Sequence, residues 1–172
     1  MSIFVAIELG AEARAAASHA IARWSPTVNA KWQQAEKLHL TVVFLGNPKP
    51  DGLAEKLDVL ASRAQPFTLK LHGAGTFVTE RAASVLWLGV GGELEKLHAL
   101  EREAANLYGD SGRPYVPHVT LARAQTSDAF APALSALNAV DGPGFQVTKL
   151  TLFESTHHQF RSIHESPLHS HA

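Results

Sequence analysis

KWQQAEKLHLTVVFLG, residues 31–46, contains the pattern on which the interpretation of the chain depends. Its second half begins with HLTV, in which His39 and Thr41 alternate with apolar residues. Successive side chains of a β-strand point to opposite faces, so an imidazole and a hydroxyl would share one face while apolar side chains fill the other. The stretch therefore predicts a half-buried strand that presents His39 and Thr41 together.

The same pattern occurs a second time as HVTL, residues 118–121, where His118 and Thr120 take the same places. A chain with 10 His and 10 Thr in 172 residues is expected to contain an H-x-T pattern with apolar neighbours roughly 0.12 times. The two histidines are 79 positions apart, close to half the chain, which favours an internal duplication. Two similar lobes related by a pseudo-two-fold axis would aim both His-Thr faces into one cleft.

Two opposed histidines suit phosphoryl chemistry, because the attacking and leaving oxygens lie roughly in line on opposite sides of phosphorus. An imidazole has an unperturbed pKa near 6.5, so one ring can accept a proton while the other donates one. The hydroxyls of Thr41 and Thr120 can donate hydrogen bonds to the non-bridging phosphate oxygens. This scheme requires neither a metal nor a cofactor.

Hydrophobic alternation and helical periodicity predict further elements around the two motifs. Strands are expected at 2–9, 67–77, 83–90 and 118–124, and helices at 11–24, 51–64, 93–108 and 127–140. Gly109 is expected to cap the third helix, and Ser127 or Asp128 to begin the fourth. The run 145–155 is expected to pair with 159–168 as a terminal hairpin. Because several strands follow one another without a helix, the order predicts an α+β fold with antiparallel sheets.

Length and composition are typical of one soluble globular domain over residues 1–172, of which 45% are hydrophobic and 18% charged. No apolar run approaches the roughly 18 residues of a membrane span, and the start lacks a signal peptide's basic region, so we expect a cytoplasmic protein without a membrane partner. We also expect a monomer. The absence of cysteine excludes disulfides, thiolate zinc sites and a cysteine nucleophile. A formal net charge of −1 argues against a broad basic surface, so a nucleic acid would be held locally, at an end.

The two motifs resemble those of the two-histidine (2H) phosphoesterases, and within them the RNA 2′,3′-cyclic phosphodiesterases, also called LigT-like proteins or 2′-5′ RNA ligases. The resemblance covers almost the whole chain, because IFVAIEL at 3–9, SVLWLGV at 84–90 and RPYVPHVTLAR at 113–123 resemble further landmarks in their usual order. It implies a bilobal α+β fold with two pseudo-symmetric lobes, each with an antiparallel sheet and packed helices, and an active-site cleft between them. It also implies metal-independent opening of a 2′,3′-cyclic phosphate to a 2′-phosphomonoester.

The resemblance also assigns roles to single residues. His39 would be the proton donor, His118 the proton acceptor that activates water, and Arg123 a phosphate-binding residue beside Thr41 and Thr120. The substrates would be RNA 2′,3′-cyclic phosphate ends or nucleoside 2′,3′-cyclic phosphates, with 2′-5′ RNA ligation as a reverse side activity. Strict alternation places Arg123 on the strand face opposite His118, so it would reach the ligand only through strand twist, a bulge or the strand end.

Other interpretations stay open. The fold could serve a non-catalytic nucleotide or RNA-end binding module, and ten histidines raise a metallohydrolase, although no H-E-x-x-H or H-x-H pattern is present for the three ligands of a catalytic zinc. GVGGEL at 89–94 lacks the spacing of a phosphate-binding glycine loop and favours a plain turn. Several further side chains are weaker candidates for base stacking or for cations in the cleft: Trp32, Tyr115, Lys31, Lys37, Arg113 and Arg161.

Overall fold

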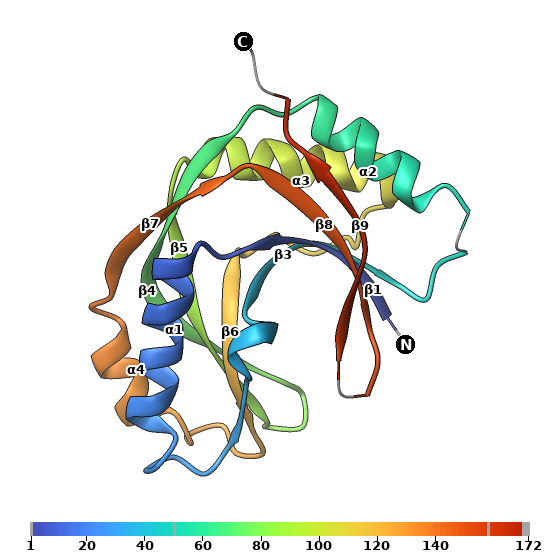
Figure 1. The fold of residues 1–172 in the computed structure, drawn as a ribbon. Helices are drawn as coiled ribbons and strands as arrows, with labels where there is room; N and C mark the ends of the chain where they lie inside the picture. The colour runs from blue at the N-terminus through green and yellow to red at the C-terminus, as the bar shows by residue number, and fades with distance from the viewer. Residues whose placement is uncertain (1, 50, 158, 170–172) are drawn as a thin grey trace.

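Two antiparallel sheets organise the chain in the computed structural model, which describes residues 2–49, 51–157 and 159–169 (Figure 1). The first sheet has the order β3-β1-β8-β9, with β1 at Ser2–Glu8, β3 at His39–Gly46, β8 at Lys149–Ser155 and β9 at Phe160–Pro167. The second has the order β2-β6-β5-β4-β7, with β2 at Lys31–Trp32, β4 at Phe67–Val78, β5 at Ser84–Gly92, β6 at His118–Ala124 and β7 at Asp141–Val147. The predicted α+β class with antiparallel sheets is confirmed.

The helices of the described residues are α1 at Ala11–Trp24, α2 at Leu53–Ser62, α3 at Leu94–Tyr108 and α4 at Ala131–Leu137, with a short 3-10 helix, η1, at Ala35–Lys37. Two of them, α1 and α3, start from a strand of one sheet and pack on a strand of the other. Helix α1 leaves β1 of the first sheet and packs on β7 of the second, whereas α3 leaves β5 of the second sheet and packs on β3 and α2 (Figure 1). Each motif strand comes after such a helix and pairs with the strand that leads into that helix: β3 pairs with β1, and β6 pairs with β5. The two lobes predicted from the paired motifs are therefore present.

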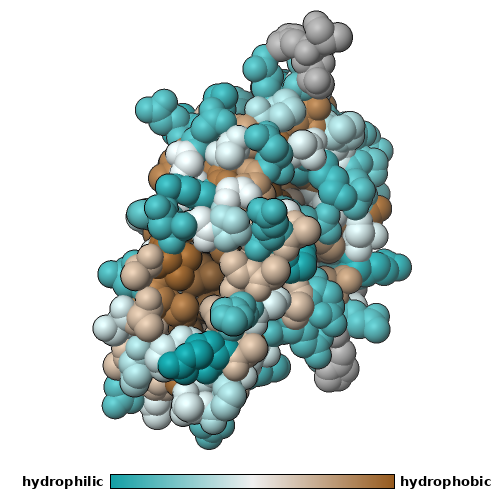
Figure 2. All heavy atoms as spheres, turned by 60° about the vertical axis from the view of Figure 1, so that its left-hand side comes forward, coloured by the Kyte–Doolittle hydropathy of each residue, from teal (hydrophilic) through white to brown (hydrophobic). Residues whose placement is uncertain are grey.

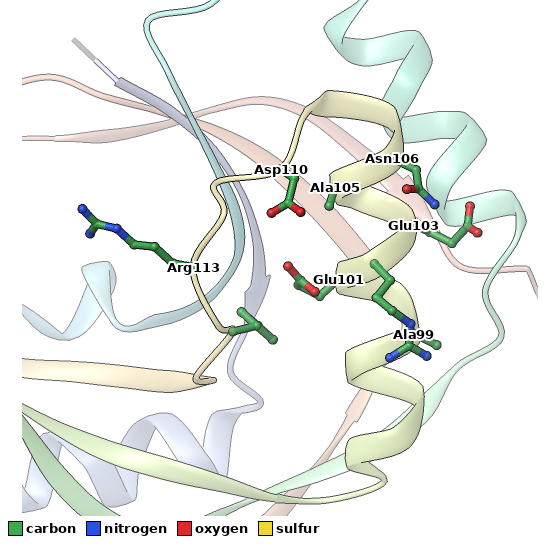
Figure 3. Close-up of a pocket in the computed structure, with 9 residues that line it drawn as sticks. Ala99, Glu101, Glu103, Ala105, Asn106, Asp110 and Arg113 are labelled. Atoms are coloured by element: carbon green, nitrogen blue, oxygen red, sulfur yellow. The ribbon is translucent and has the colours of Figure 1, made fainter.

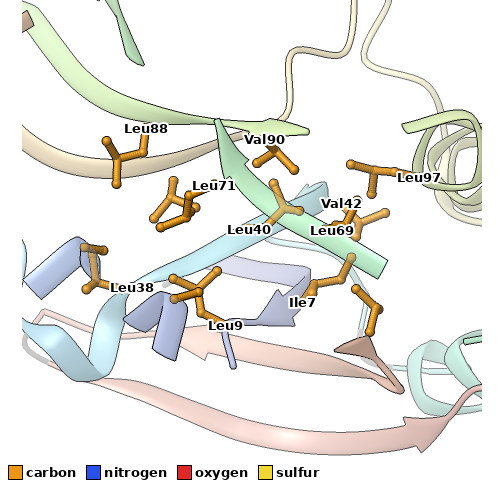
Figure 4. Close-up of a cluster of buried hydrophobic side chains, with 14 of the residues drawn as sticks. Ile7, Leu9, Leu38, Leu40, Val42, Leu69, Leu71, Leu88, Val90 and Leu97 are labelled. Carbon is orange, nitrogen blue, oxygen red and sulfur yellow. The ribbon is translucent and has the colours of Figure 1, made fainter. Parts of the chain in front are cut away.

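One continuous apolar core holds the sheets and helices together. Figure 4 shows that its side chains come from strands of both sheets and from α3: Ile7, Leu40, Val42, Leu69, Leu71, Leu88, Val90 and Leu97. Burying such side chains is the main favourable contribution to folding. Because Leu38, Leu40 and Val42 fill the buried face of β3 and its approach, His39 and Thr41 are left on the other face.

The fourth helix is shorter than the sequence predicted. A helix is present within the predicted range 127–140, but it spans only Ala131–Leu137 and has no side-chain cap, so the predicted N-cap at Ser127 or Asp128 was wrong. Proline is favoured in the first turn of a helix, since its missing N–H has no intrahelical partner there, and Pro132 occupies that place.

The run 145–155 does not form one strand of a terminal hairpin, which corrects that prediction in part. Residues 149–155 form β8 and pair with β9, but 145–147 belong to β7 and pair with β4 of the other sheet. Phe145 and Val147 are buried beside Leu69 and Phe67 in this pairing. The chain therefore changes sheet at Thr148, where two adjacent polar residues, Thr148 and Lys149, interrupt the alternation of apolar and polar residues.

Figure 2 shows the face on the left of Figure 1, where hydrophilic side chains predominate and surround a hollowed area of hydrophobic ones. In the part of the chain that the structure describes, no helix is both long and apolar enough to cross a membrane.

Candidate active site

Strands β3 and β6 come from different sheets but lie against each other, and this brings the two motifs together (Figure 1). A cavity of about 240 Å³ opens between them. Its lining residues are Ser2, Phe4, Gln33, Lys37, His39, Thr41, Phe44, His118, Thr120, Arg123, Ser155 and Phe160. All five residues that the sequence singled out for catalysis and phosphate binding are in this set, so they share one cavity.

His39 is held in one orientation by its own strand and by aromatic neighbours. Its Nδ1 lies 2.7 Å from the carbonyl oxygen of Lys37, which can only accept, so Nδ1 carries a hydrogen. Nε2, 2.9 Å from Oγ1 of Thr41, is therefore the nitrogen that gains or loses a proton. The imidazole stacks on Phe4 at a centroid distance of 4.9 Å and meets the edge of Phe160 at 5.3 Å.

His118 repeats this arrangement in the other lobe. Its Nδ1 donates to the carbonyl oxygen of Val116, two residues back as in the first motif, at the same distance of 2.7 Å. The ring meets the edge of Phe77 at 4.9 Å and packs on Trp87 at 5.8 Å. Nε2 of His118 is therefore the nitrogen whose protonation is variable, as in His39.

Both histidines favour the neutral form in the ligand-free protein. Burial lowers the pKa of His39 below 6.5, and the nearby charges of His118 and Arg14 lower it further. Burial also lowers the pKa of His118, with a smaller contribution from the charge of Arg123. In both rings the hydrogen bond to a backbone carbonyl opposes the shift. A bound phosphate anion would raise both pKa values, because an opposite charge favours the protonated ring.

A β-bulge brings Arg123 to the cavity and resolves the conflict with strict alternation. From Thr120 to Ala122 strand β6 advances two residues while β5 advances one, from Trp87 to Leu86, so Leu121 is the extra residue. A bulge of this kind resets which side chains share a face. Arg123 consequently lines the cavity together with His118, as the sequence had allowed through a bulge.

Not all of the weaker cationic candidates line the cavity. Lys37 lines the cavity, and its Nζ lies 5.5 Å from the ring centroid of Phe160. Arg161 instead forms an ion pair with Glu154. Of the described residues that line the cavity, none is acidic, so Lys37 and Arg123 make it attractive to an anion.

Arg113 and Lys31 do not line the cavity within the described residues. Arg113 belongs to a separate groove beside α3, where Figure 3 shows it pointing away from the helix while Glu101 and Asp110 point into the groove. This groove is lined by three acidic side chains, Glu101, Glu103 and Asp110, against two arginines, Arg102 and Arg113, so it has no excess of positive charge to hold a phosphate.

The proposed base-stacking side chains Trp32 and Tyr115 are structural. Nε1 of Trp32 donates to the carbonyl oxygen of Val28 at 3.0 Å, and its ring meets the edge of Phe130 at 6.1 Å. The hydroxyl of Tyr115 donates to the backbone carbonyl oxygen of Thr41 at 2.7 Å. Neither is among the described residues that line the cavity.

The glycines within residues 89–94 allow the neighbouring strand β4 to approach closely. Gly89, Gly91 and Gly92 all lie in the last four residues of β5, and a Cβ at Gly89 would meet the carbonyl oxygen of His72 at 2.3 Å. The neighbouring strand β4 therefore requires glycine at this place, as expected for a plain structural connection.

Three aromatic residues of the cavity were missed by the sequence analysis: Phe4, Phe44 and Phe160. Phe160 follows a turn far along the chain, and no local pattern marks it. Phe44 did carry a signal, because it follows His39 by five positions, the spacing at which Arg123 follows His118.

As for a metal centre, no group of three or more His, Asp or Glu side chains able to hold an ion occurs in residues 2–49, 51–157 and 159–169.

Comparison with known proteins identifies relatives over most of the chain. The family model of the 2′-5′ RNA ligase superfamily matches residues 12–159. The RNA 2′,3′-cyclic phosphodiesterase of Geobacillus stearothermophilus is 34% identical in a 166-position alignment that covers 88% of this chain and 51% of the relative, so the chain spans about half of that protein's length. The Escherichia coli K12 protein of the same name is 34% identical in a 165-position alignment that covers 90% of this chain and 86% of the relative.

A solved structure supports the same fold. The crystal structure of E. coli LigT complexed with 3′-AMP superposes with a TM-score of 0.75 at 28% sequence identity, covering 98% of each chain. The bilobal arrangement with antiparallel sheets that was expected from the sequence is thus shared with an experimentally determined protein.

Proposed function

The chain belongs to the 2′-5′ RNA ligase superfamily, and from this we propose that it is an RNA 2′,3′-cyclic phosphodiesterase that opens cyclic phosphate ends to 2′-phosphomonoesters. One observation carries the proposal: two imidazoles from different sheets present their Nε2 atoms to one cavity, each with its Nδ1–H fixed by a backbone carbonyl. Two rings of the same fixed tautomer can act as acid and base on one phosphorus. The named relatives support the substrate class.

In the proposed reaction, neutral His118 accepts a proton from water through Nε2 as the water oxygen bonds to phosphorus. The bond from phosphorus to the ribose 3′-oxygen breaks, and protonated His39 donates its Nε2 proton to that oxygen. The backbone carbonyl of Val116 fixes the tautomer in which Nε2 of His118 has a lone pair. The negative substrate raises the pKa of His39, so the proton donor is charged once the substrate is bound.

The remaining polar side chains of the cavity would stabilise the charge on the phosphate. Arg123 offers a planar set of N–H donors that matches two non-bridging oxygens. Thr120 and Thr41 offer hydroxyl donors from the same strand faces as the histidines. Preorganised donors of this kind are worth most where water is largely excluded.

Histidine variants test the proposal directly. His39→Ala and His118→Ala are each expected to lower kcat/KM for a nucleoside 2′,3′-cyclic phosphate by about 10²- to 10⁴-fold. His19→Ala is the matched control, since His19 is exposed on α1 and lies outside the cavity. Full activity in either cavity variant, with a folded protein by circular dichroism, would exclude the mechanism.

The same site would also allow ligation, with a 5′-hydroxyl in place of water. Neutral His118 would accept the proton of the 5′-hydroxyl as its oxygen bonds to phosphorus, the bond from phosphorus to the ribose 3′-oxygen would break, and protonated His39 would donate its proton to that oxygen, which leaves a 2′-5′ link. Water at high concentration favours hydrolysis, so ligation is expected only as a side activity. Incubation of RNA halves at millimolar concentration tests it, and the absence of joined product would remove it.

Because one chain supplies both histidines, we further propose that residues 1–172 act as a single two-lobed monomer.

A further inference from the structure

Gln33 is a polar side chain of the cavity that the proposed reaction does not use. It lines the cavity and is partly buried. Among the residues that the structure describes, none forms a hydrogen bond with the amide group of its side chain. Such an amide has one acceptor oxygen and two N–H donors, which are left to a ligand or to water.

The backbone ties Gln33 to the strand that carries His118. It follows β2, which pairs with β6. The N–H of Gln33 donates to the carbonyl oxygen of Leu121 at 2.8 Å, and Leu121 is the extra residue of the bulge that brings Arg123 to the cavity. Gln33 therefore belongs to the His118 side of the cavity.

Alternation along the chain accounts for the direction of this side chain. The preceding residue, Trp32, packs on Phe130 and donates from Nε1 to the carbonyl oxygen of Val28. Successive side chains of an extended chain point to opposite sides. Trp32 accordingly faces away from the cavity, and Gln33 faces into it.

The His118 side is also the side from which the nucleophile attacks in the proposed reaction. The attacking and leaving oxygens lie roughly in line on opposite sides of phosphorus, so the ribose lies beside His39 and the water beside His118. Nε2 of His118 accepts one hydrogen of this water. The second hydrogen needs another acceptor if the water is to be held in one orientation.

The amide oxygen of Gln33 suits this second hydrogen best. On the same side of the cavity Arg123 can only donate, and the hydroxyl of Thr120 is directed to the phosphate in the proposed reaction. The described part of the cavity wall carries no carboxylate that could accept instead. The volume of about 240 Å³ lies below the roughly 300–1,000 Å³ of most ligand pockets, which keeps the wall close to the reacting groups.

We propose that the side-chain oxygen of Gln33 accepts the second hydrogen of the attacking water and so orients the water toward phosphorus. This inference rests on the proposed function, because it assumes that water attacks a cyclic phosphate beside His118. One hydrogen of the water moves to Nε2 of His118, and the other stays on the oxygen that bonds to phosphorus. The ribose 3′-oxygen leaves with the proton of His39, and Gln33 itself exchanges no proton.

Methanol as a competing nucleophile tests this role, because its one hydroxyl hydrogen goes to His118 and none remains for Gln33. The substrate is adenosine 2′,3′-cyclic phosphate in buffer with a fixed fraction of methanol. Phosphorus NMR measures the ratio of the 2′-monophosphate to its methyl ester. Both products form from one enzyme–substrate complex, so this ratio does not depend on substrate affinity or on the fraction of folded enzyme.

Gln33→Met removes the acceptor at similar side-chain length and is expected to lower the ratio by about 2- to 10-fold, the effect of one hydrogen bond. Gln33→Glu retains an acceptor oxygen and should keep the ratio of the wild type. Gln34→Met is the matched control, because Gln34 is the next residue, is exposed and lies outside the cavity.

An unchanged ratio in Gln33→Met would overturn the inference, and slower formation of both products in equal measure would assign Gln33 to the phosphate instead. If no enzyme forms the ester, kcat for hydrolysis decides. Gln33→Met must then lower kcat by about 2- to 10-fold and leave the Kd of adenosine 2′-monophosphate unchanged, and any other result would contradict the inference. If the wild type turns over no cyclic phosphate, the proposed function fails and this inference fails with it.

Discussion

Tyr115 donates a hydrogen bond from its hydroxyl to the backbone carbonyl oxygen of Thr41 at 2.7 Å, and so links the loop before one motif to the strand of the other. Burial raises the pKa of this hydroxyl, which keeps it protonated and able to donate. Tyr115 precedes by one residue Val116, whose carbonyl orients His118. The contact therefore couples the positions of the two histidine motifs.

Removal of this hydroxyl should affect activity more than stability alone explains. Tyr115→Phe leaves the carbonyl of Thr41 without this partner, and we expect a loss of about 1 kcal/mol in unfolding free energy, or about 2–4 °C in Tm. We also expect kcat/KM to fall, because the loop before His118 would lose its hydrogen bond to the strand that carries His39. Tyr108→Phe is the matched control. The Tyr108 hydroxyl donates to the carbonyl oxygen of Leu53 at a distance of 2.9 Å, and neither residue lines the cavity. Equal kcat/KM in the two variants would remove the positioning role.

The lowered pKa values of the two histidines predict an acidic optimum for kcat/KM. This parameter reports the free enzyme, which must have His39 protonated and His118 neutral. Burial lowers the pKa of both rings below 6.5, so the protonated fraction of His39 falls tenfold per pH unit above that value. We expect kcat/KM to peak below pH 6.5 and to decline with a slope near −1 above it. A value that still rises between pH 7 and 8 would contradict this assignment.

Arg123 should determine the affinity for phosphate. Arg123→Ala is expected to weaken binding of inorganic phosphate by about 10- to 100-fold, the usual effect of losing a charged hydrogen bond. Arg123→Lys should restore part of it, because the charge remains while the bidentate geometry is lost. Titration calorimetry measures both, with Arg81→Ala as the control, since Arg81 is exposed in the turn between β4 and β5. Unchanged affinity in Arg123→Ala would show that the bulge brings Arg123 to the cavity for another reason.

The sequence predicted which side chains of the two motifs share one cavity, because the signal is local. Alternation of apolar and polar residues determines the face of His39 and of His118, and the structure brings both into one cavity. Helix α1 at Ala11–Trp24 coincides with its predicted range, because an alanine-rich amphipathic run has few competing structures. The roles of donor and acceptor stay predictions.

What the sequence did not predict depends on pairing between distant segments. Bulges at Val42 and Leu121 arise from the register with β1 and β5, and the sequence of one strand alone does not specify them. The change of sheet at Thr148 likewise depends on which partner strand is free. The place of Phe160 in the cavity depends on the hairpin of β8 and β9 folding beside β1.

Hydrolysis of a nucleoside 2′,3′-cyclic monophosphate in excess chelator, followed by phosphorus NMR, tests whether the two histidines open a cyclic phosphate without a metal ion. We expect the wild type to form a 2′-phosphomonoester at the same rate with and without chelator, and His39→Ala and His118→Ala to lose this activity. A 3′-phosphate as the product would contradict the assigned leaving oxygen, and activity that disappears with the chelator would contradict the two-histidine mechanism. No turnover of this substrate, or of a short RNA with a cyclic end, would contradict the proposed function itself.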